Sequence, residues 1–310
     1  MIKKIKKPKF MSFAVTWSCN SKCYMCSTWK QKYNQEELSL DNIRKTFSND
    51  IFSKLEEVIL TGGEPTLRSD IKQIIEILHN NTHASIGITS NGLKDTYLIK
   101  IVEDLASIPI SLYLSLDGPS PQVHDRIRGV KGSFKKIGFL VNYLKEKPNV
   151  NLSLGMIITP LNMDYILKTK ELCNELGVGF GVRLYEITQF FHNLDKKLVF
   201  SREQKRKITK QLIKFNDPLV DEYYCTIIKF LKGYNKKPFE CLGGQESFFL
   251  SPNGDVNLCA YHLDKVFGNV KYDSLESIFM EKQDKKYLAK NCSGCLNACE
   301  FSWSKGLNAL

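Results

Sequence analysis

The chain has 310 residues, 43% of them hydrophobic, which is enough for one large domain and a small one around a real core. No stretch approaches the length of a transmembrane helix, so no membrane partner is expected. The net charge of +11 could attract an acidic partner. The lysines are spread along the chain without an aromatic-interleaved basic patch, which favours solvated helix faces and no nucleic acid.

The first residues carry the charge pattern of a secretion signal, because several lysines precede an apolar run that begins at Phe10. The run is short, no small-residue cleavage site follows it, and Trp17 is too bulky for a lipoprotein site. We therefore expect a cytoplasmic protein that begins with a basic leader and a first strand. The ten cysteines agree with this, because their compact clusters favour metal ligation in a reducing compartment over disulfides.

Strand-like and helix-like segments alternate through the first part of the chain. Strands are expected at residues 10–17, 58–61, 85–89, 110–116, 151–158 and 181–185. Helices are expected at residues 40–47, 70–80, 95–105, 133–145 and 163–176, with Asp70 and Ser133 as N-caps and Gly177 ending the fifth helix. Six strands with five intervening helices predict parallel βα units, too few for a closed eight-fold barrel. The predicted fold class is α/β, an open partial (β/α)6 TIM-like barrel.

The rest of the chain has a different character. Residues 201–237 are charged and helical in pattern, with Pro218 breaking them into two pieces. Residues 248–259 have the pattern of a hairpin around Asn253-Gly254. We expect three parts: a partial barrel over residues 1–200, a helical bridge over 201–238 and a small C-terminal domain over 239–310.

Three cysteines stand together directly after the first expected strand. Cys19, Cys23 and Cys26 form a C-x3-C-x2-C triplet with Tyr24 after the second cysteine. A cubane cluster takes one thiolate per iron, so three cysteines leave the fourth iron open to bind and reduce a substrate or cofactor. The alternative is a zinc knuckle that lacks one ligand.

Glycines and polar residues follow the next three strands. The segments are Gly62-Gly63-Glu64-Pro65, Ser90-Asn91-Gly92 and Ser115-Leu116-Asp117-Gly118. Ligands bind at the carboxyl ends of such strands, glycines let the backbone approach a ligand closely, and Glu64 could hold an ammonium group. For Ser115 and Asp117 the alternative is ordinary strand-to-loop turn chemistry.

A second group of cysteines lies near the C-terminus. Cys241 and Cys259 are spaced C-x12-G-x4-C, Cys292 and Cys295 form C-x2-C, and Cys299 is a fifth candidate. Spacing alone also allows a zinc ribbon with four cysteine ligands.

The triplet and the G-G-E-P turn together resemble the radical S-adenosylmethionine (SAM) superfamily. The resemblance implies a [4Fe–4S] cluster on Cys19, Cys23 and Cys26, whose open iron chelates the methionine part of SAM. It implies that the remaining site residues contact SAM, with Tyr24 beside the adenine. These are Gly62, Gly63, Glu64, Ser90, Asn91, Ser115 and Asp117. Arg128, in a segment common after S-L-D-G, would pair with a carboxylate or be a solvated arginine.

Beside such a barrel, the second cysteine group resembles the SPASM and twitch auxiliary-cluster domains. Five cysteines are too few for two auxiliary clusters, so the resemblance implies one, ligated by Cys241, Cys259, Cys292 and Cys295, and two [4Fe–4S] clusters in the whole chain. Cys299 replaces one of these ligands or is a free thiol. Cys173 and Cys225 are expected in the core, with hydrogen-atom donation to a substrate radical as the alternative.

The resemblance implies an oxidoreductase-type enzyme that reductively cleaves SAM and abstracts a hydrogen from an unactivated C–H bond. The preferred substrate is a ribosomally made peptide, and the alternative is dehydrogenation of a small alcohol or amino sugar. A reductase such as flavodoxin or ferredoxin is the expected partner. The rival from another class is a non-catalytic iron–sulfur electron carrier, which would not need a SAM site.

Overall fold

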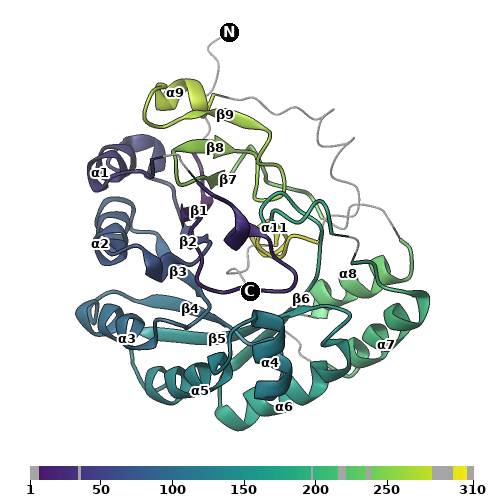
Figure 1. Ribbon diagram of the computed structural model, residues 1–310. Coiled ribbons are helices and arrows are strands. Elements are labelled where there is room, and N and C mark those ends of the chain that lie inside the picture. Colours follow the sequence, from purple (N-terminus) through teal and green to yellow (C-terminus); the bar gives the residue numbers. More distant parts are fainter. Residues whose placement is uncertain are drawn as a thin grey trace.

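The computed structural model describes residues 7–33, 36–196, 198–215, 221–234, 239–280 and 296–305. A single nine-stranded sheet runs through these residues in the order β6-β5-β4-β3-β2-β1-β7-β8-β9 (Figure 1). Strands β1 to β7 are parallel, whereas β8 and β9 are antiparallel to their neighbours. The strands are β1 (Phe10–Thr16), β2 (Glu57–Gly62), β3 (Ser85–Ser90), β4 (Ile110–Ser115), β5 (Val150–Ile158), β6 (Gly179–Leu184), β7 (Ser247–Leu250), β8 (Asp255–Asn257) and β9 (Val266–Asn269).

The helices lie mostly outside the arc of strands (Figure 1). The α-helices are α1 (Leu40–Phe47), α2 (Ile71–Thr82), α3 (Asp95–Asp104), α4 (Pro121–Arg128), α5 (Ser133–Leu144), α6 (Ile166–Leu176), α7 (Arg202–Ile213), α8 (Asp221–Leu231), α9 (Leu275–Ile278) and α11 (Ala298–Ser304). The 3-10 turns are η1 (Thr28–Lys30), η2 (Asp50–Phe52), η3 (Pro65–Leu67) and η4 (Met163–Tyr165). Among the described strands β6 and β9 do not pair with each other, so the predicted open barrel is confirmed.

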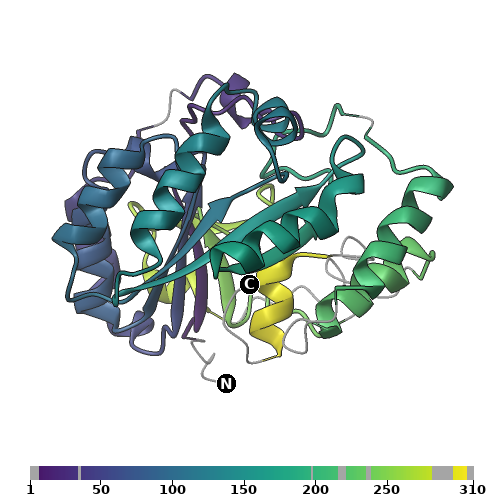
Figure 2. The ribbon, with the colours of Figure 1, turned by 90° about the horizontal axis from the view of Figure 1, so that it is seen from below.

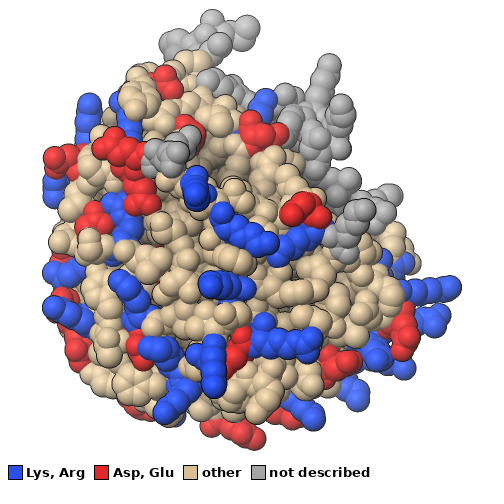
Figure 3. All heavy atoms as spheres, viewed as in Figure 1, with Lys and Arg blue, Asp and Glu red and all other residues tan. Residues whose placement is uncertain are grey.

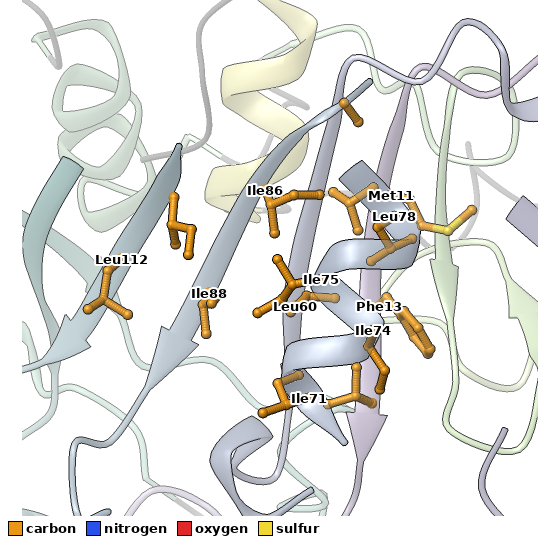
Figure 4. Close-up of a cluster of buried hydrophobic side chains, with 14 of the residues drawn as sticks. Met11, Phe13, Leu60, Ile71, Ile74, Ile75, Leu78, Ile86, Ile88 and Leu112 are labelled. Carbon is orange, nitrogen blue, oxygen red and sulfur yellow. The ribbon is translucent and has the colours of Figure 1, made fainter. Parts of the chain in front are cut away.

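The main core lies between the sheet and these outer helices. Helix α2 shows why, because its apolar residues recur at i, i+3, i+4 and i+7 and point together toward the strands (Figure 4). They are Ile71, Ile74, Ile75 and Leu78. Each is almost fully buried, and burying such a side chain stabilises the fold by roughly 1.5–3 kcal/mol. This packing of the helices on the sheet holds in place the strands whose carboxyl ends carry the candidate functional site.

The C-terminal segment belongs to the same sheet. Strand β7 pairs in parallel with β1, with Phe10 opposite Ser247, and the expected hairpin forms between β7 and β8. Helix α11 lies inside the arc of strands (Figures 1 and 2). Its Trp303 stacks on Phe10 at 5.3 Å between ring centroids, and its Nε1 donates to Glu57 Oε2 at 2.5 Å. The inner face of the barrel is therefore filled near the start of β1 and β2.

The structure confirms two of the predictions about single residues and contradicts two others. Gly177 ends α6 with φ +71°, and Cys173 is buried, as predicted. The prediction of Ser133 as an N-cap was wrong, because Gly132 holds that position and the Ser133 hydroxyl donates to Asp125. Cys225 was predicted in the core and is exposed, since the buried stripe of α8 passes beside it.

Asp70 does precede α2, but its carboxylate does not cap the helix. Both of its oxygens accept from the Arg68 guanidinium, at 2.8 and 2.7 Å. Arg68 therefore takes the carboxylate away from the backbone N–H groups of the first helical turn.

The face seen in Figure 3 shows how the positive charge is distributed. Lys and Arg side chains lie over the middle of this face, and Asp and Glu side chains lie mostly toward its periphery (Figure 3). Within the described part of the chain, no helix is both long enough and apolar enough to cross a bilayer.

Candidate functional site

The loop that carries the three cysteines, residues 18–27, is held by the end of α4. Lys22 N donates to Arg128 O at 3.0 Å, Tyr24 N donates to Ile127 O at 2.8 Å, and Ser21 Oγ donates to Arg128 O at 3.0 Å. Gly129 follows α4 with φ +66°, and a Cβ there would lie 2.4 Å from Lys22 O. The cysteine loop therefore needs a glycine at this contact.

The two glycines after β2 hold the other side of the loop. Gly63 N donates to Thr16 O and Glu64 N donates to Ser18 O, both at 2.8 Å. A Cβ on Gly62 would lie 2.1 Å from Thr16 O, and one on Gly63 would lie 2.1 Å from Ser18 O. Both glycines are thus required for the approach of the G-G-E-P turn to the cysteine loop, whatever else they contact.

Glu64 is 1% exposed and joins the ends of β2 and β3. Its Oε1 accepts from Thr66 N at 3.1 Å, Thr66 Oγ1 at 2.7 Å and Ser90 Oγ at 2.8 Å. Its Oε2 accepts from Asn91 N at 2.7 Å. Four donors from two strand ends fix this carboxylate, so any ligand group that it binds meets a preorganised acceptor.

Polar groups also surround the cysteine sulfurs. Ser21 Oγ lies 3.2 Å from Cys23 Sγ, and Thr28 N donates to Cys26 Sγ at 3.4 Å. Asn91 Nδ2 lies 4.0 Å from Cys19 Sγ, so the polar segment after β3 reaches the loop after β1. Burial raises the pKa of Cys19 to about 12, so a thiolate at this position would need a compensating positive charge.

Arg128 supplies positive charge beneath the loop. Its Nη1 donates to Asp117 Oδ2 at 3.2 Å, and the Asp117 Oδ1 accepts from Ile157 N at 2.9 Å. Burial opposes the cation, but the negative charges of Cys23 and Asp117 outweigh it and raise the pKa of Arg128. Both oxygens of Asp117 are thus used within the protein, where the carboxylate ties β4 to β5 and holds the arginine.

The structure brings some predicted residues together and leaves others apart. Ser90, Asn91 and Glu64 meet directly, and Asn91 also reaches the cysteine loop. Ser115 is the last residue of β4, opposite Gly155, and is partly buried. Tyr24 is 40% exposed, with Lys196 Nζ 5.8 Å from its ring centroid. Contacts of these residues with SAM stay predictions.

The second cysteine group is only partly described. Cys241 and Cys259 are buried, and Gly243 N donates to Cys241 Sγ at 3.3 Å. Cys299 lies in the first turn of α11, 3.8 Å from Arg183 Nη2. Cys292 and Cys295 lie outside the described residues.

The chemistry of the three loop cysteines fits an iron–sulfur cluster. Among the described residues no three His, Cys, Asp or Glu side chains gather around one point as a single metal ion requires. A cubane places each thiolate on a different iron, so its ligands do not converge on one atom. The three loop cysteines, with a hydroxyl and an amide on their sulfurs, fit such a cluster.

One carboxyl at the barrel mouth was not predicted. Glu186 lies two residues beyond β6 and accepts a short hydrogen bond from the Tyr261 hydroxyl and one from Leu296 N at 3.4 Å. Burial raises the pKa of Glu186 to about 7. The sequence contained a signal for Glu186, because this acid directly follows the sixth predicted strand. Ligands bind at the carboxyl ends of parallel strands, and the same argument selected Glu64.

Known families match most of the chain. The profile of the Radical SAM superfamily matches residues 14–173, and the profile of an iron–sulfur cluster-binding domain, SPASM, matches residues 241–299. The two matched segments contain the cysteine loop and the second cysteine group, respectively.

Two curated relatives and one solved structure illustrate the range of similar proteins. Mycofactocin maturase MftC of Mycolicibacterium smegmatis is 24% identical, over 86% of this chain and 68% of that protein. The AdoMet-dependent heme synthase of Methanosarcina barkeri is 25% identical, over 95% of this chain and 90% of that protein. Streptococcus suis SuiB, solved with its precursor peptide SuiA, has the same fold with a TM-score of 0.69 and 17% identity, over 95% of this chain and 71% of SuiB.

Proposed function

Because this chain belongs to the radical SAM superfamily and carries a SPASM-type iron–sulfur cluster-binding domain, we propose that it modifies a ribosomally made peptide. One observation carries the choice of substrate. The fold shared with SuiB, a protein solved with a precursor peptide, extends over 95% of this chain and includes the C-terminal segment. The relative MftC, named a maturase, agrees with it.

In this proposal Cys19, Cys23 and Cys26 hold a [4Fe–4S] cluster that leaves one iron for SAM. When bound and reduced, this cluster supplies the electron that cleaves SAM and so gives the radical chemistry that removes hydrogen from an unactivated C–H bond. Such chemistry is of the oxidoreductase type, and a flavodoxin or ferredoxin would deliver the electron.

The chain's own residues position and shield this chemistry. The end of α4 and the G-G-E-P turn hold the cysteine loop from two sides, and Arg128 offsets the negative charge of the thiolates. Glu64 offers its fixed carboxylate to the amino group of SAM, and Asn91 lies between it and Cys19. Because these groups are already in place, binding would cost little reorganisation.

A second [4Fe–4S] cluster would lie on Cys241, Cys259, Cys292 and Cys295. We propose that it accepts an electron from the substrate or grips the substrate. About eight irons per chain are then expected, four per cubane. The triple alanine variant of the cysteine loop should retain about four, and zinc without iron in that variant would favour the ribbon interpretation.

A small-molecule substrate is the second candidate. The heme synthase relative supports it, because that likeness extends over 90% of its length. In both cases the compact spacing of the cysteines favours metal ligation in a reducing compartment such as the cytoplasm.

The decisive experiment measures SAM cleavage. Anaerobically reconstituted protein with dithionite should convert SAM to 5′-deoxyadenosine, and alanine at Cys19, Cys23 or Cys26 should abolish this. Cys225→Ala, an exposed thiol on α8, is the matched control and should keep the activity. Cleavage retained without any one loop cysteine would refute the assignment. A wild-type protein that never cleaves SAM would favour the electron-carrier alternative.

A further inference from the structure

Basic side chains surround the cysteine loop. They come from the loop itself, from η1, from the end of α4 and the turn after it, and from the segment after β6. We call them the basic collar, which consists of Lys22, Lys30, Arg126, Lys131 and Lys196. All are exposed except Lys196, which is half-buried. Helix α4 lies in front near the middle of Figure 1, and in the same view Lys and Arg side chains lie over the middle of the face (Figure 3).

One side of the collar is attached to the loop through α4. The backbone N–H of Lys22 donates to Arg128 O at 3.0 Å, so the last turn of α4 lies against the loop. Arg126 belongs to that last turn, and Lys131 follows two residues after the Gly129 that ends the helix. These cations are therefore held beside the middle of the cysteine loop.

The other side of the collar is attached through Lys196. Its Nζ donates to Cys26 O at 3.3 Å and makes a shorter hydrogen bond to Tyr24 O. Burial lowers the pKa of Lys196, and the positive charge of Lys30 lowers it further, which shows that the two cations lie close together. The collar thus reaches around both sides of the segment that carries Cys23 and Cys26.

This surface has an excess of positive charge. Within the described part of the chain, no carboxylate forms an ion pair with a collar residue. Nearby acids are fewer. Asp125 accepts hydrogen bonds from residues 132–134, Asp195 precedes Lys196, and Asp264 lines the same recess as Lys30. Such a surface attracts a partner of negative charge.

The position of the collar selects the kind of acidic partner. Tyr24 stands between Cys23 and Cys26 and is 40% exposed, so the loop reaches the protein surface inside the collar. A protein that delivers an electron needs a close approach to the cluster loop from outside and no entry into the barrel. A substrate, in contrast, has to reach the strand ends within the barrel.

We propose that the basic collar docks an acidic electron-donor protein of the flavodoxin or ferredoxin type. The inference rests on the proposed function, which needs an electron to cleave SAM, and adds the surface at which that electron arrives. The reduced donor loses one electron, the cluster on the loop cysteines gains it, and no proton or covalent bond is transferred. Attraction between the two surfaces speeds their association, most of all at low salt.

The test measures docking apart from activity. A recombinant flavodoxin and a recombinant ferredoxin, both strongly acidic, are titrated against the reconstituted enzyme by biolayer interferometry at about 0.01 M ionic strength, where the Debye length is about 30 Å. The collar variant combines three reversals outside the cysteine loop, Lys30→Glu, Arg126→Glu and Lys131→Glu. It should bind the carrier about tenfold or more weakly than wild type, and the difference should shrink at about 0.15 M.

Two matched variants separate docking from net charge and from folding. Three reversals at exposed sites near the amino ends of the strands change the net charge equally and should leave affinity within about threefold of wild type. They are Lys45→Glu, Lys54→Glu and Lys145→Glu. The charge-conserving set Lys30→Arg, Arg126→Lys and Lys131→Arg should bind like wild type. Every variant should keep its iron and should cleave SAM with dithionite, a small reductant that needs no docking surface.

The outcomes that overturn the proposal are direct. Equal affinity of wild type and the collar variant for both carriers would do so, as would a wild type that binds neither. An oligoglutamate peptide and a short single-stranded RNA are tested alongside, and tighter binding of either one at the collar would assign this surface to another partner. SAM cleavage by wild type with dithionite tests the proposed function independently, so the two failures are distinguishable.

Discussion

Glu64→Gln is the sharpest test of how the site is built. The substitution keeps the size of the side chain and replaces one carboxylate oxygen by an NH2 group. In the native structure one oxygen accepts from Thr66 and Ser90, and the other accepts from the backbone N–H of Asn91. Whichever way the amide points, its NH2 faces the backbone N–H of Asn91 or that of Thr66.

The cost of the substitution follows from this geometry. The two hydroxyl donors can rotate, but a backbone N–H cannot, so one buried donor is left facing another donor. Such an unsatisfied group costs about 1–3 kcal/mol, and the lost charge adds to it. In a chain of this size, a loss of about 1 kcal/mol of unfolding free energy lowers the melting temperature by a few degrees. The Tm of Glu64→Gln should therefore fall by about 2–10 °C.

The assay is thermal unfolding followed by circular dichroism, with iron content and SAM affinity measured on the same samples. Glu146→Gln, an exposed glutamate after α5, is the matched control and should not change Tm. We expect Glu64→Gln to retain its iron and to bind SAM more weakly. An unchanged Tm would refute the reasoning that this carboxylate ties β2 to β3.

Three further predictions concern other parts of the molecule. Gly63→Ala should lower the iron content, because its Cβ would lie 2.1 Å from Ser18 O, whereas Gly138→Ala, with nothing within 4 Å, should retain it. Glu186 has a pKa of about 7 in the folded chain and about 4.5 in the unfolded one, so the folded state binds the extra proton between these values. Its contribution to stability therefore falls as pH rises from about 4.5 to 7, by up to about 3 kcal/mol, and urea unfolding of Glu186→Gln should lose that slope. Cys292→Ala with Cys295→Ala should remove about four irons per chain and stop product formation in a protein that still melts cooperatively; normal turnover would show that the second cluster is only structural.

The sequence predicted the edge of the sheet where the site lies, for a simple reason. Parallel strands place their carboxyl ends together, so residues after β1, β2 and β3 had to meet. The contacts among Glu64, Ser90, Asn91 and Cys19 follow from that rule.

Helix α4 was not predicted, because it lacks the apolar periodicity that marks a helix. Only His124, Ile127 and Arg128 of its eight residues are buried. Its role depends on its C-terminal end, which holds the cysteine loop through backbone atoms, and backbone contacts of this kind leave no pattern of side chains.

Local sequence patterns also could not predict which strand of the sheet the C-terminal hairpin pairs with. The Asn253-Gly254 turn predicts two antiparallel strands, and β7 and β8 form them. Strand β7 also pairs with β1, and this pairing joins residues more than two hundred positions apart in the sequence. Hydrophobic alternation shows that a strand has a buried face but does not show which strand lies beside it.

The residues that build the cysteine loop are also those to which the family resemblance assigns contacts with SAM. Gly63 brings two backbones into contact, and Glu64 accepts four hydrogen bonds within the protein. Loss of activity in either variant therefore does not by itself measure SAM binding, because a displaced cysteine loop would lose its cluster as well. The two causes separate when iron content and SAM affinity are measured together. Retained iron with weakened SAM binding identifies a ligand contact, and the loss of both identifies a structural one.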